Sequence, residues 1–227
     1  MGEVSEEAAS PAERRRLKVR GAILSAAERV FADEGESGLS IRRIAEEIDY
    51  SPAAIYKYFV SKDELVDELK EAFFERILDQ VHLISNLNET PLVRARKCVT
   101  SYINTALEKP HHYAAAFVGT ASFDQVPKSE EDFLSTNKGQ AFNALVNLLA
   151  KGVESGELID TIDLTIMAKS AWASMHGLAM MIAHFPNFPA FVPGAAEMAR
   201  ADFIELHAET VIRAFERRPQ DNGEGGA

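Results

Sequence analysis

Hydroxyl and ammonium side chains lie close together between residues 51 and 58. Such groups donate hydrogen bonds to phosphate oxygens and to the edges of nucleic-acid bases. Two alanines among them allow a backbone to approach a surface closely. The residues concerned are Ser51, Ala53, Ala54, Tyr56, Lys57 and Tyr58. This composition predicts a segment that contacts DNA.

Two start signals predict the helices that position this segment. Ser40 is suited to cap a first helix, in which apolar residues recur at helical spacing up to Ile48. Asp49-Tyr50 interrupts the pattern, Ser51 caps a second helix, and Pro52 occupies its first position, where the missing N–H costs nothing. The result is a pair of short helices joined by a tight turn.

Longer helices are expected on both sides of this pair. A basic, amphipathic helix begins near residue 14 and is closed by Gly35. Downstream, Ser61 and Glu64 form a capping box, with Ser61 serving the Glu64 amide and the Glu64 carboxylate reaching back to Ser61. The short second helix needs these neighbours, because it is not stable alone. By itself the pattern fits a buried helical corner equally well.

Residues 14 to 65 resemble the DNA-binding domain of the TetR family of bacterial transcriptional regulators. The resemblance is carried by Ile23-Leu24-x-Ala26-Ala27, Phe31-x-x-x-Gly35, Ser40-Ile41-Arg42-x-Ile44-Ala45, Ser51-x-x-x-Ile55-Tyr56-x-Tyr58-Phe59 and Ser61-Lys62-x-Glu64-Leu65. The chain departs from the usual pattern at Asp49-Tyr50, where Gly-Val is common, and at Ala53, where glycine is frequent. The turn is therefore expected to be slightly reshaped.

The resemblance also implies a division of the DNA contacts. Phosphate contacts fall to Ser40, Arg42, Tyr58 and Lys62, and base-facing positions are Ser51, Ala53, Tyr56 and Lys57. Lys57 is our choice for sequence readout.

The net charge of −11 is unevenly distributed along the 227 residues. Residues 13 to 62 hold ten basic against eight acidic side chains, whereas residues 63 to 227 hold 14 against 24. The acidic part would be repelled by phosphates, so the basic end should face DNA. The densest basic cluster is Arg14, Arg15, Arg16, Lys18 and Arg20. It is either a phosphate-binding or minor-groove arm or a solvated helix start.

The remainder predicts an all-α protein, with no strand pattern and no internal repeat. Helices are expected over residues 61 to 86, 90 to 108, 110 to 119, 128 to 155, 162 to 184 and 194 to 217. The expected organisation is a disordered acidic tail (1–13), a three-helix helix-turn-helix domain (14–65), a larger helical ligand-binding and dimerisation domain (66–218) and a disordered tail (219–227).

The apolar stretch from Leu164 to Phe185 reads as a buried helix rather than a membrane span, since Lys169 and two histidines interrupt it. Trp172 to Gly177 resembles a Trp-x-x-x-His-Gly signature of one group of TetR C-terminal domains. Small residues on this helix form a stripe for close packing, either against a second subunit or within the chain. A homodimer is favoured, because two half-sites double the base contacts.

Resemblance to the family further implies a small-molecule effector bound in the larger domain. The candidate lining groups combine aromatic walls with a few polar groups, although most such aromatics belong simply to a core. They are Tyr113, Phe117, Phe133, Asn137, Phe142, Trp172, His176 and Met180. The implied mechanism is a ligand-responsive repressor that leaves its operator, a double-stranded DNA, when the effector binds.

An enzyme finds little support in the sequence. Phosphate loops, nucleophile elbows, dithiol pairs and metal-ligand clusters are missing, so neither a cofactor nor a metal is expected. The single cysteine, Cys98, and the polar N-terminus without an apolar signal segment favour the cytoplasm and no membrane association. The remaining alternative is a helical ligand-binding or interaction protein that has lost specific DNA binding.

Overall fold

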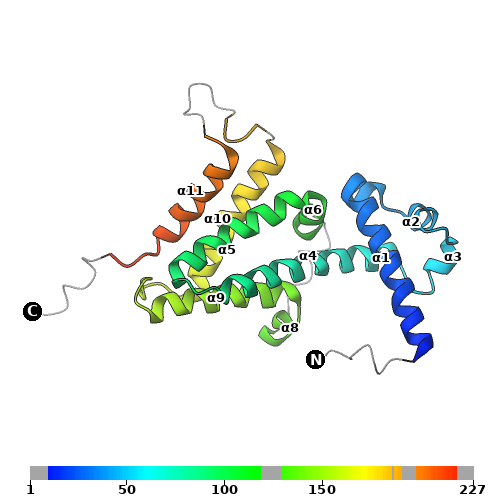
Figure 1. Ribbon diagram of the computed structural model, residues 1–227, viewed down its shortest axis with the longest axis horizontal. Coiled ribbons are helices and arrows are strands. Elements are labelled where there is room, and N and C mark those ends of the chain that lie inside the picture. The colour runs from blue at the N-terminus through cyan, green and yellow to red at the C-terminus, as the bar shows by residue number, and fades with distance from the viewer. Residues whose placement is uncertain (1–9, 119–128, 186, 191–197, 219–227) are drawn as a thin grey trace, which may run out of the picture. The chain divides into compact units, whose positions relative to one another are not determined.

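The computed structural model describes residues 10–118, 129–185, 187–190 and 198–218. Within these ranges the regular structure is helical, and the only strand-like pairing is an isolated bridge, so the expected all-α fold is confirmed. None of the described helices is long and apolar enough to cross a bilayer. The helices labelled in Figure 1 are α1 (Pro11–Gly38), α2 (Ile41–Glu47), α3 (Pro52–Ile55), α4 (Lys62–Ser85), α5 (Pro91–Glu108), α6 (Pro110–Val118), α8 (Glu130–Leu134), α9 (Asn137–Glu154), α10 (Leu164–His184) and α11 (Arg200–Arg213).

The chain divides into two compact units. The first unit comprises residues 1–73 and 109–125, and the second comprises residues 74–108 and 126–227. Helix α4 therefore contributes to both units. Helix α6, which we assigned from sequence to the larger C-terminal domain, packs on α1 within the first unit. The first unit is thus built from α1, α2, α3, α6 and the start of α4.

Helix α1 begins ahead of the basic cluster. The Ser10 hydroxyl accepts a hydrogen bond from the Glu13 amide at 3.3 Å, and the Glu13 carboxylate accepts from the Ser10 amide at 2.8 Å. This is a complete capping box, with proline in the first turn of the helix. Residues 11–13, which we expected to be a disordered tail, are therefore helical. Residues 1–9 and 219–227, the rest of the two expected tails, lie outside the described residues.

The first unit packs around one apolar core. Helix α1 leaves the helical conformation at Gly35, whose φ of 68° is readily adopted only by glycine, as the closing glycine predicted. Ile55 and Phe59 are both fully buried in this core, which anchors the short α3 segment from below. The Arg20 guanidinium covers the Phe59 ring at 4.7 Å from its centre. The short helix is therefore held by its neighbours, as the sequence predicted.

Helices α8 and α9 meet at a corner, whereas the sequence predicted one helix over residues 128 to 155. The Thr136 hydroxyl accepts a hydrogen bond from the Gly139 amide at 3.0 Å and so caps α9. A Cβ atom at Gly139 would lie 1.9 Å from the Phe133 carbonyl oxygen, so this approach requires glycine. The prediction of a single helix was wrong, because the apolar period continues across the corner.

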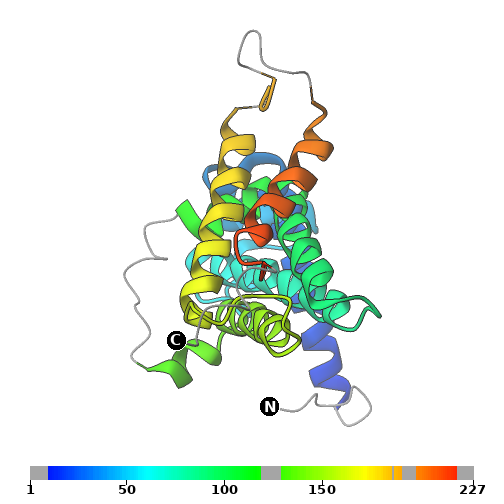
Figure 2. The same ribbon diagram turned by 90° about the vertical axis from the view of Figure 1, so that its left-hand side faces the viewer.

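In the second unit α5 packs against α9, α10 and α11. Helices α10 and α11 also lie side by side, in contact with each other (Figure 2). Helix α11 starts at Arg200 and not at residue 194, and the two described residues before it are not helical. The small-residue stripe of α10 is buried within this bundle, so it packs inside the chain. Its residues are Ala168, Ala171, Met175, Leu178 and Ile182.

Candidate functional site

Serine caps fix the starts of both short helices of the first unit. The Ser40 hydroxyl oxygen accepts from the Arg43 amide at 3.2 Å, and the Ser51 hydroxyl oxygen accepts from the Ala54 amide at 3.2 Å. Each cap uses only an oxygen lone pair. Each exposed serine O–H therefore remains available to donate to a phosphate oxygen.

The turn between α2 and α3 adopts a glycine-type geometry without glycine. The amides of Ile48 and Tyr50 both donate to the Ala45 carbonyl, at 3.3 and 2.9 Å. The second of these bonds is the long bond of a Schellman motif, which places a left-handed residue just past the helix end. That residue is Asp49, with φ 58°. The reshaping expected from Asp49-Tyr50 is therefore local strain at one aspartate.

The base-facing candidates share the exposed side of the α3 segment. Tyr56 is 55% exposed, while Tyr58, a phosphate candidate, is half-buried and packs against the core of the first unit. The exposed members are Ser51, Ala53, Tyr56 and Lys57. The segment thus has one face fixed in the core and one face open to a partner.

Backbone hydrogen bonds continue beyond the end of α3 and hold these side chains in place. The Tyr56 amide donates to the Pro52 carbonyl at 3.2 Å, and the Phe59 amide donates to the Ile55 carbonyl at 3.1 Å. The Lys57 amide donates to the Ala54 carbonyl at 3.3 Å. Tyr56 and Lys57 are therefore presented on a fixed turn rather than on a free loop.

The phosphate-contact candidates differ in how they are engaged. The Arg42 side chain is 84% exposed and pairs with Glu46 one turn later at 3.0 Å. An exposed pair of this kind contributes little to stability, so its guanidinium can exchange the carboxylate for a phosphate. The half-buried Lys62 donates to the Glu36 carbonyl at 2.8 Å, which ties the last turn of α1, beyond Gly35, to the start of α4. No described residue forms an ion pair with Lys57.

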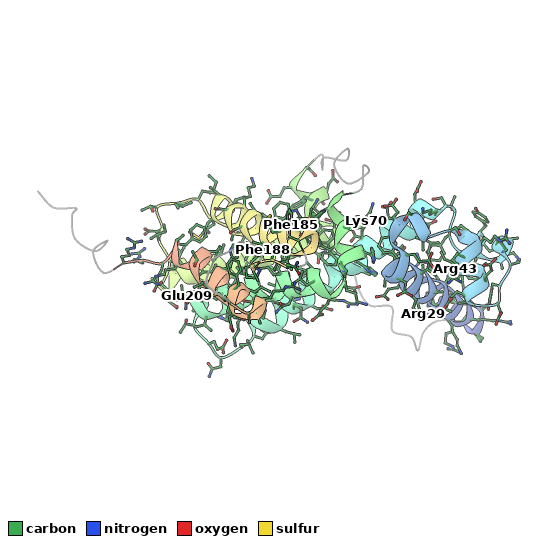
Figure 3. The ribbon with its side chains drawn as sticks, turned by 90° about the horizontal axis from the view of Figure 1, so that it is seen from above. Arg29, Arg43, Lys70, Phe185, Phe188 and Glu209 are labelled. Atoms are coloured by element: carbon green, nitrogen blue, oxygen red, sulfur yellow. The ribbon has the colours of Figure 1, made fainter. Side chains whose placement is uncertain are left out.

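Two further basic side chains of the first unit are neutralised by carboxylates. Arg29 of α1 and Arg43 of α2 are labelled in Figure 3. Arg29 contacts Glu47 at 3.3 Å, while Arg43 lies 3.6 Å from Glu34 and 3.8 Å from Glu47. The Arg29–Glu47 and Arg43–Glu34 pairs join α1 to α2, whereas the Arg43–Glu47 pair lies within α2.

The basic cluster of α1 also has two kinds of member. Both carboxylate oxygens of Glu68 pair with Arg20, which in addition covers Phe59 and so belongs to the packing of the first unit. The other four basic residues are exposed on the helix. This stretch is helical from residue 11 onwards, and its contact with phosphates or a minor groove stays a prediction. The exposed members are Arg14, Arg15, Arg16 and Lys18.

The capping box at the start of α4 differs in one bond from the expected one. The Ser61 hydroxyl accepts from the Glu64 amide at 3.1 Å, as predicted. The Glu64 carboxylate, however, accepts from the Val60 amide, one residue before Ser61. The carboxylate therefore directly holds the end of residues 51–60, which we call the recognition segment.

The second unit contains an apolar cavity. Its volume is about 90 Å³ as the space open to the centres of water-sized spheres, and about 690 Å³ as all space not filled by atoms, open solvent at its mouth included. Its walls come from five helices and are largely aromatic and aliphatic, as is usual for small-molecule sites. The lining residues are Phe74, Ile77, Gln80, Val81, Cys98, Ser101, Tyr102, Phe133, Lys138, Ala141, Phe142, Leu145, Trp172 and Met175.

Three of the eight expected ligand-lining residues meet at this cavity: Phe133, Phe142 and Trp172. The rings of Phe133 and Phe142 lie edge to face, 6.2 Å apart. Two others, Tyr113 and Phe117, are buried in the first unit, where both pack against Phe73. The remaining three are half-buried and do not line this cavity. These are Asn137, His176 and Met180.

His176 reaches the cavity wall indirectly, through Tyr102. The Trp172 indole N–H donates to the Tyr102 hydroxyl oxygen at 3.4 Å, and this hydroxyl lies 3.2 Å from Nδ1 of His176. With its oxygen accepting from the indole, the Tyr102 O–H is available to donate to a neutral imidazole. Burial lowers the pKa of His176 and so favours that neutral form.

Sequence reasoning missed the polar lining residues Gln80, Ser101, Tyr102 and Lys138. Tyr102 carried a usable signal, because it is a hydroxyl-bearing residue on the apolar face of an expected helix. Lys138 carried none, since it follows the corner between α8 and α9 that the sequence did not predict. Cys98 also lines the cavity, and burial raises the pKa of its thiol to about 12, so it stays protonated.

Two models of known protein families match this chain. Residues 23–69 match a family model described as bacterial regulatory proteins of the tetR family, and residues 95–205 match one described as a tetracyclin repressor-like C-terminal domain. The chain belongs to the TetR family of bacterial transcriptional regulators. It is therefore a DNA-binding regulator of transcription, as the resemblance in residues 14 to 65 implied.

Relatives of this TetR-family chain are themselves regulators. It is 24% identical over 161 residues to the HTH-type transcriptional repressor KstR2 of Mycobacterium tuberculosis, covering 69% of this chain and 79% of the relative. It is 27% identical over 163 residues to the HTH-type transcriptional regulator PksA of Bacillus subtilis, covering 72% and 78%. The fold resembles that of the TetR family regulator PfmR from Thermus thermophilus, with TM-score 0.60, 19% identity and coverage of 86% and 99%.

Metal chemistry has no evident site in the described residues. No group of three or more His, Cys, Asp or Glu side chains is placed there to hold a metal ion. The relatives named above are transcriptional regulators rather than enzymes.

Proposed function

We propose that this TetR-family chain is a ligand-responsive repressor that binds operator DNA as a homodimer. In this proposal α3 and the turn after it enter the major groove, while α2 and Lys62 fix the unit on phosphates. The observation that carries it is the α3 segment itself, with Ile55 and Phe59 buried on one side and Tyr56 and Lys57 exposed on the other. Such a segment presents donors to base edges without moving its backbone.

Lys57 and Lys62 are the matched pair that tests DNA reading. Lys57→Ala should reduce the preference for the chain's own upstream DNA over scrambled DNA by about 5- to 150-fold, since a base contact is worth about 1–3 kcal/mol. Lys62→Ala should weaken binding to both DNAs alike, because a phosphate contact carries no sequence information. Fluorescence anisotropy across a salt series measures both effects.

The opposite pattern would exchange the roles of the two lysines. Equal, weak binding of the unaltered protein to both DNAs would favour the alternative of a helical ligand-binding protein without specific DNA recognition. A melting curve of each variant is the control, because Lys62 also bonds to the Glu36 carbonyl within the fold.

A second stripe on α10 supports the homodimer. Ile166, Ala173, Gly177 and Met181 recur along one side of the helix and are all exposed in the single chain, Ile166 by 60%. A Cβ atom at Gly177 would meet nothing within 4 Å in this chain. The stripe is therefore apolar, exposed among the described residues and small at its centre, at Ala173 and Gly177, which suits close packing against a symmetry-related helix.

Ala173→Glu tests the dimer. A charge placed in a close apolar interface should raise the dimer dissociation constant by about 100-fold or more, and operator affinity should fall with it. Sedimentation velocity measures the assembly, and Asn147→Glu, at an exposed position of α9, is the control. An unaltered protein that is monomeric at micromolar concentration would contradict the proposal.

Ligand response is proposed to act through two conformations of the dimer. The effector would occupy the cavity of the second unit and bind better to the state whose two recognition segments are wrongly spaced for DNA. Its differential affinity would then empty the operator. An effector that occupies the cavity without changing operator affinity in an anisotropy titration would contradict this coupling.

A further inference from the structure

The cavity of the second unit contains one charged side chain, Lys138. No Asp or Glu is among its lining residues in the described part of the chain. The remaining polar groups are neutral ones, such as Gln80, Ser101 and Tyr102. The local charge of the site is therefore positive, although residues 63 to 227 as a whole are strongly acidic.

The Lys138 ammonium is uncommitted among the described residues. No hydrogen bond or ion pair with another described side chain engages it, and the residue is half-buried beside the aromatic wall. Lys97 of the same unit, by contrast, pairs with Glu89 at 2.6 Å. An ammonium at a low-dielectric surface without a carboxylate attracts an anion more strongly than one fully in water.

The rest of the cavity fits a flexible apolar chain. Phe133, Phe142 and Trp172 form aromatic walls, and Ile77, Val81 and Leu145 add aliphatic ones. A saturated chain gains burial free energy for each methylene that it places in such surroundings. Apolar walls with one free ammonium match a molecule that has a tail and one negatively charged head.

We infer that the effector cavity takes an amphipathic carboxylate, whose alkyl tail lies along the aromatic wall and whose carboxylate pairs with Lys138. This inference rests on the proposed effector role of the cavity and names the chemical class of its ligand. The ion pair gives the ligand its orientation, and the tail supplies most of the affinity.

Trp172 makes the inference directly measurable, because it is the only tryptophan of the chain and lines the cavity. Tryptophan fluorescence titrations with decanoate, decan-1-ol and decyltrimethylammonium, below their micellar concentrations, compare three head groups on one tail. We expect decanoate to bind about tenfold or more tightly than the other two. From octanoate to dodecanoate, binding should tighten by up to about fourfold per methylene.

Variants of Lys138 separate the head group from the tail. Lys138→Met should weaken decanoate binding by about tenfold or more and leave decan-1-ol within about twofold. Lys138→Glu should reverse the order, so that decyltrimethylammonium binds ahead of decanoate. Lys151→Met, at an exposed position of the same helix α9, is the matched control and should change neither.

Equal affinity of the unaltered protein for the acid and the alcohol would overturn the inference. So would a Lys138→Met variant that binds decanoate as before, or the lack of any carboxylate response of Trp172 across the chain series. Operator release is measured separately by DNA anisotropy. Carboxylate-selective binding without release would contradict the proposed effector mechanism and leave the ligand chemistry in place.

Discussion

In the first unit the side chains expected to face DNA bases lie on the surface, whereas in the second unit three of the side chains expected to meet a ligand line an apolar cavity. Ser51, Tyr56 and Lys57 are exposed, and their backbone is held by caps, helical hydrogen bonds and two buried residues beneath them. The cavity instead takes its walls from α4, α5, α8, α9 and α10. The first unit therefore supports its exposed DNA-facing segment on a densely packed core. In the second unit, the helices that form the core also leave a cavity between them.

Truncation of one phenylalanine in each unit should show this difference most strongly. Phe59→Ala should cost about 3–5 kcal/mol of unfolding free energy, because Phe59 is fully buried and supports the recognition segment. Phe142→Ala should cost about 1–2 kcal/mol, because Phe142 is half-buried and already borders open space. Urea unfolding measures both. Equal losses would mean that the cavity wall is packed as tightly as the core of the first unit.

Glycine replacements offer a second contrast between the units. Gly139→Ala should destabilise the fold by about 2 kcal/mol or more, since its Cβ would collide with the Phe133 carbonyl at the corner that shapes the cavity. Gly21→Ala should stabilise it by about 0.5–1 kcal/mol, because Gly21 is an exposed residue within α1 with nothing within 4 Å of a Cβ. Thermal unfolding followed by circular dichroism measures both the expected loss and the expected gain of stability. A neutral Gly139→Ala would remove our explanation of the corner.

Relieving the strain in the turn between α2 and α3 of the first unit should give a smaller gain in stability. Asp49→Gly should stabilise the fold by about 0.5–1 kcal/mol, because glycine adopts a φ of 58° without steric cost. Asp49→Val should destabilise it, since a β-branched residue resists this conformation. Urea midpoints of the two variants should therefore move in opposite directions. A shift of both to lower stability would indicate that the Asp49 side chain is needed for another reason.

The smallest effect that we expect is a pH dependence of the unfolding free energy, which arises in the second unit. Burial holds the pKa of His176 below its unfolded value near 6.5, and His207 is shifted in the same direction for the same principal reason. Between the two pKa values the unfolded chain binds more protons. The stabilisation from a neutral imidazole is therefore complete above about pH 6.5 and is lost as pH falls towards the folded pKa.

His176→Gln should flatten this dependence, whereas His184→Gln, at an exposed position of α10, serves as the control. Urea midpoints between pH 7.5 and 5.5 provide the measurement. An unchanged slope in His176→Gln would assign the dependence to another group.

Much of the first unit could be predicted from sequence because its signals are local. Ser40 and Ser51 cap the helices that they were expected to cap, and Gly35 interrupts the helical conformation near the end of α1, where a closing glycine was expected. The family of the chain was also identifiable from residues 14 to 65, and the family models confirm it. The Trp-x-x-x-His-Gly resemblance stays a prediction. The structure adds that Trp172 and His176 meet at the Tyr102 hydroxyl.

The predictions from sequence failed mainly where contacts between residues distant in the chain determine the structure. The corner at Thr136 depends on the approach of Gly139 to the Phe133 carbonyl, a contact that the apolar period of the helix does not reveal. The sequence pattern of the stripe from Ala168 to Ile182 fits packing against a partner subunit and packing within the chain equally well. Only the burial of these residues shows that they pack within the chain. Tyr113 and Phe117 resemble ligand-contacting aromatics in sequence but belong to the core of the first unit.

The sequence alone thus determined the helical class, the capped recognition segment and the family, because caps, turn residues and helical periodicity act over a few neighbouring residues. Only the tertiary structure decided which aromatic residues surround the cavity, which face of α10 stays exposed, and that Lys138 lies beside the apolar walls. Those features depend on contacts between residues distant in sequence, and a pattern along the chain does not specify how its helices close around a space.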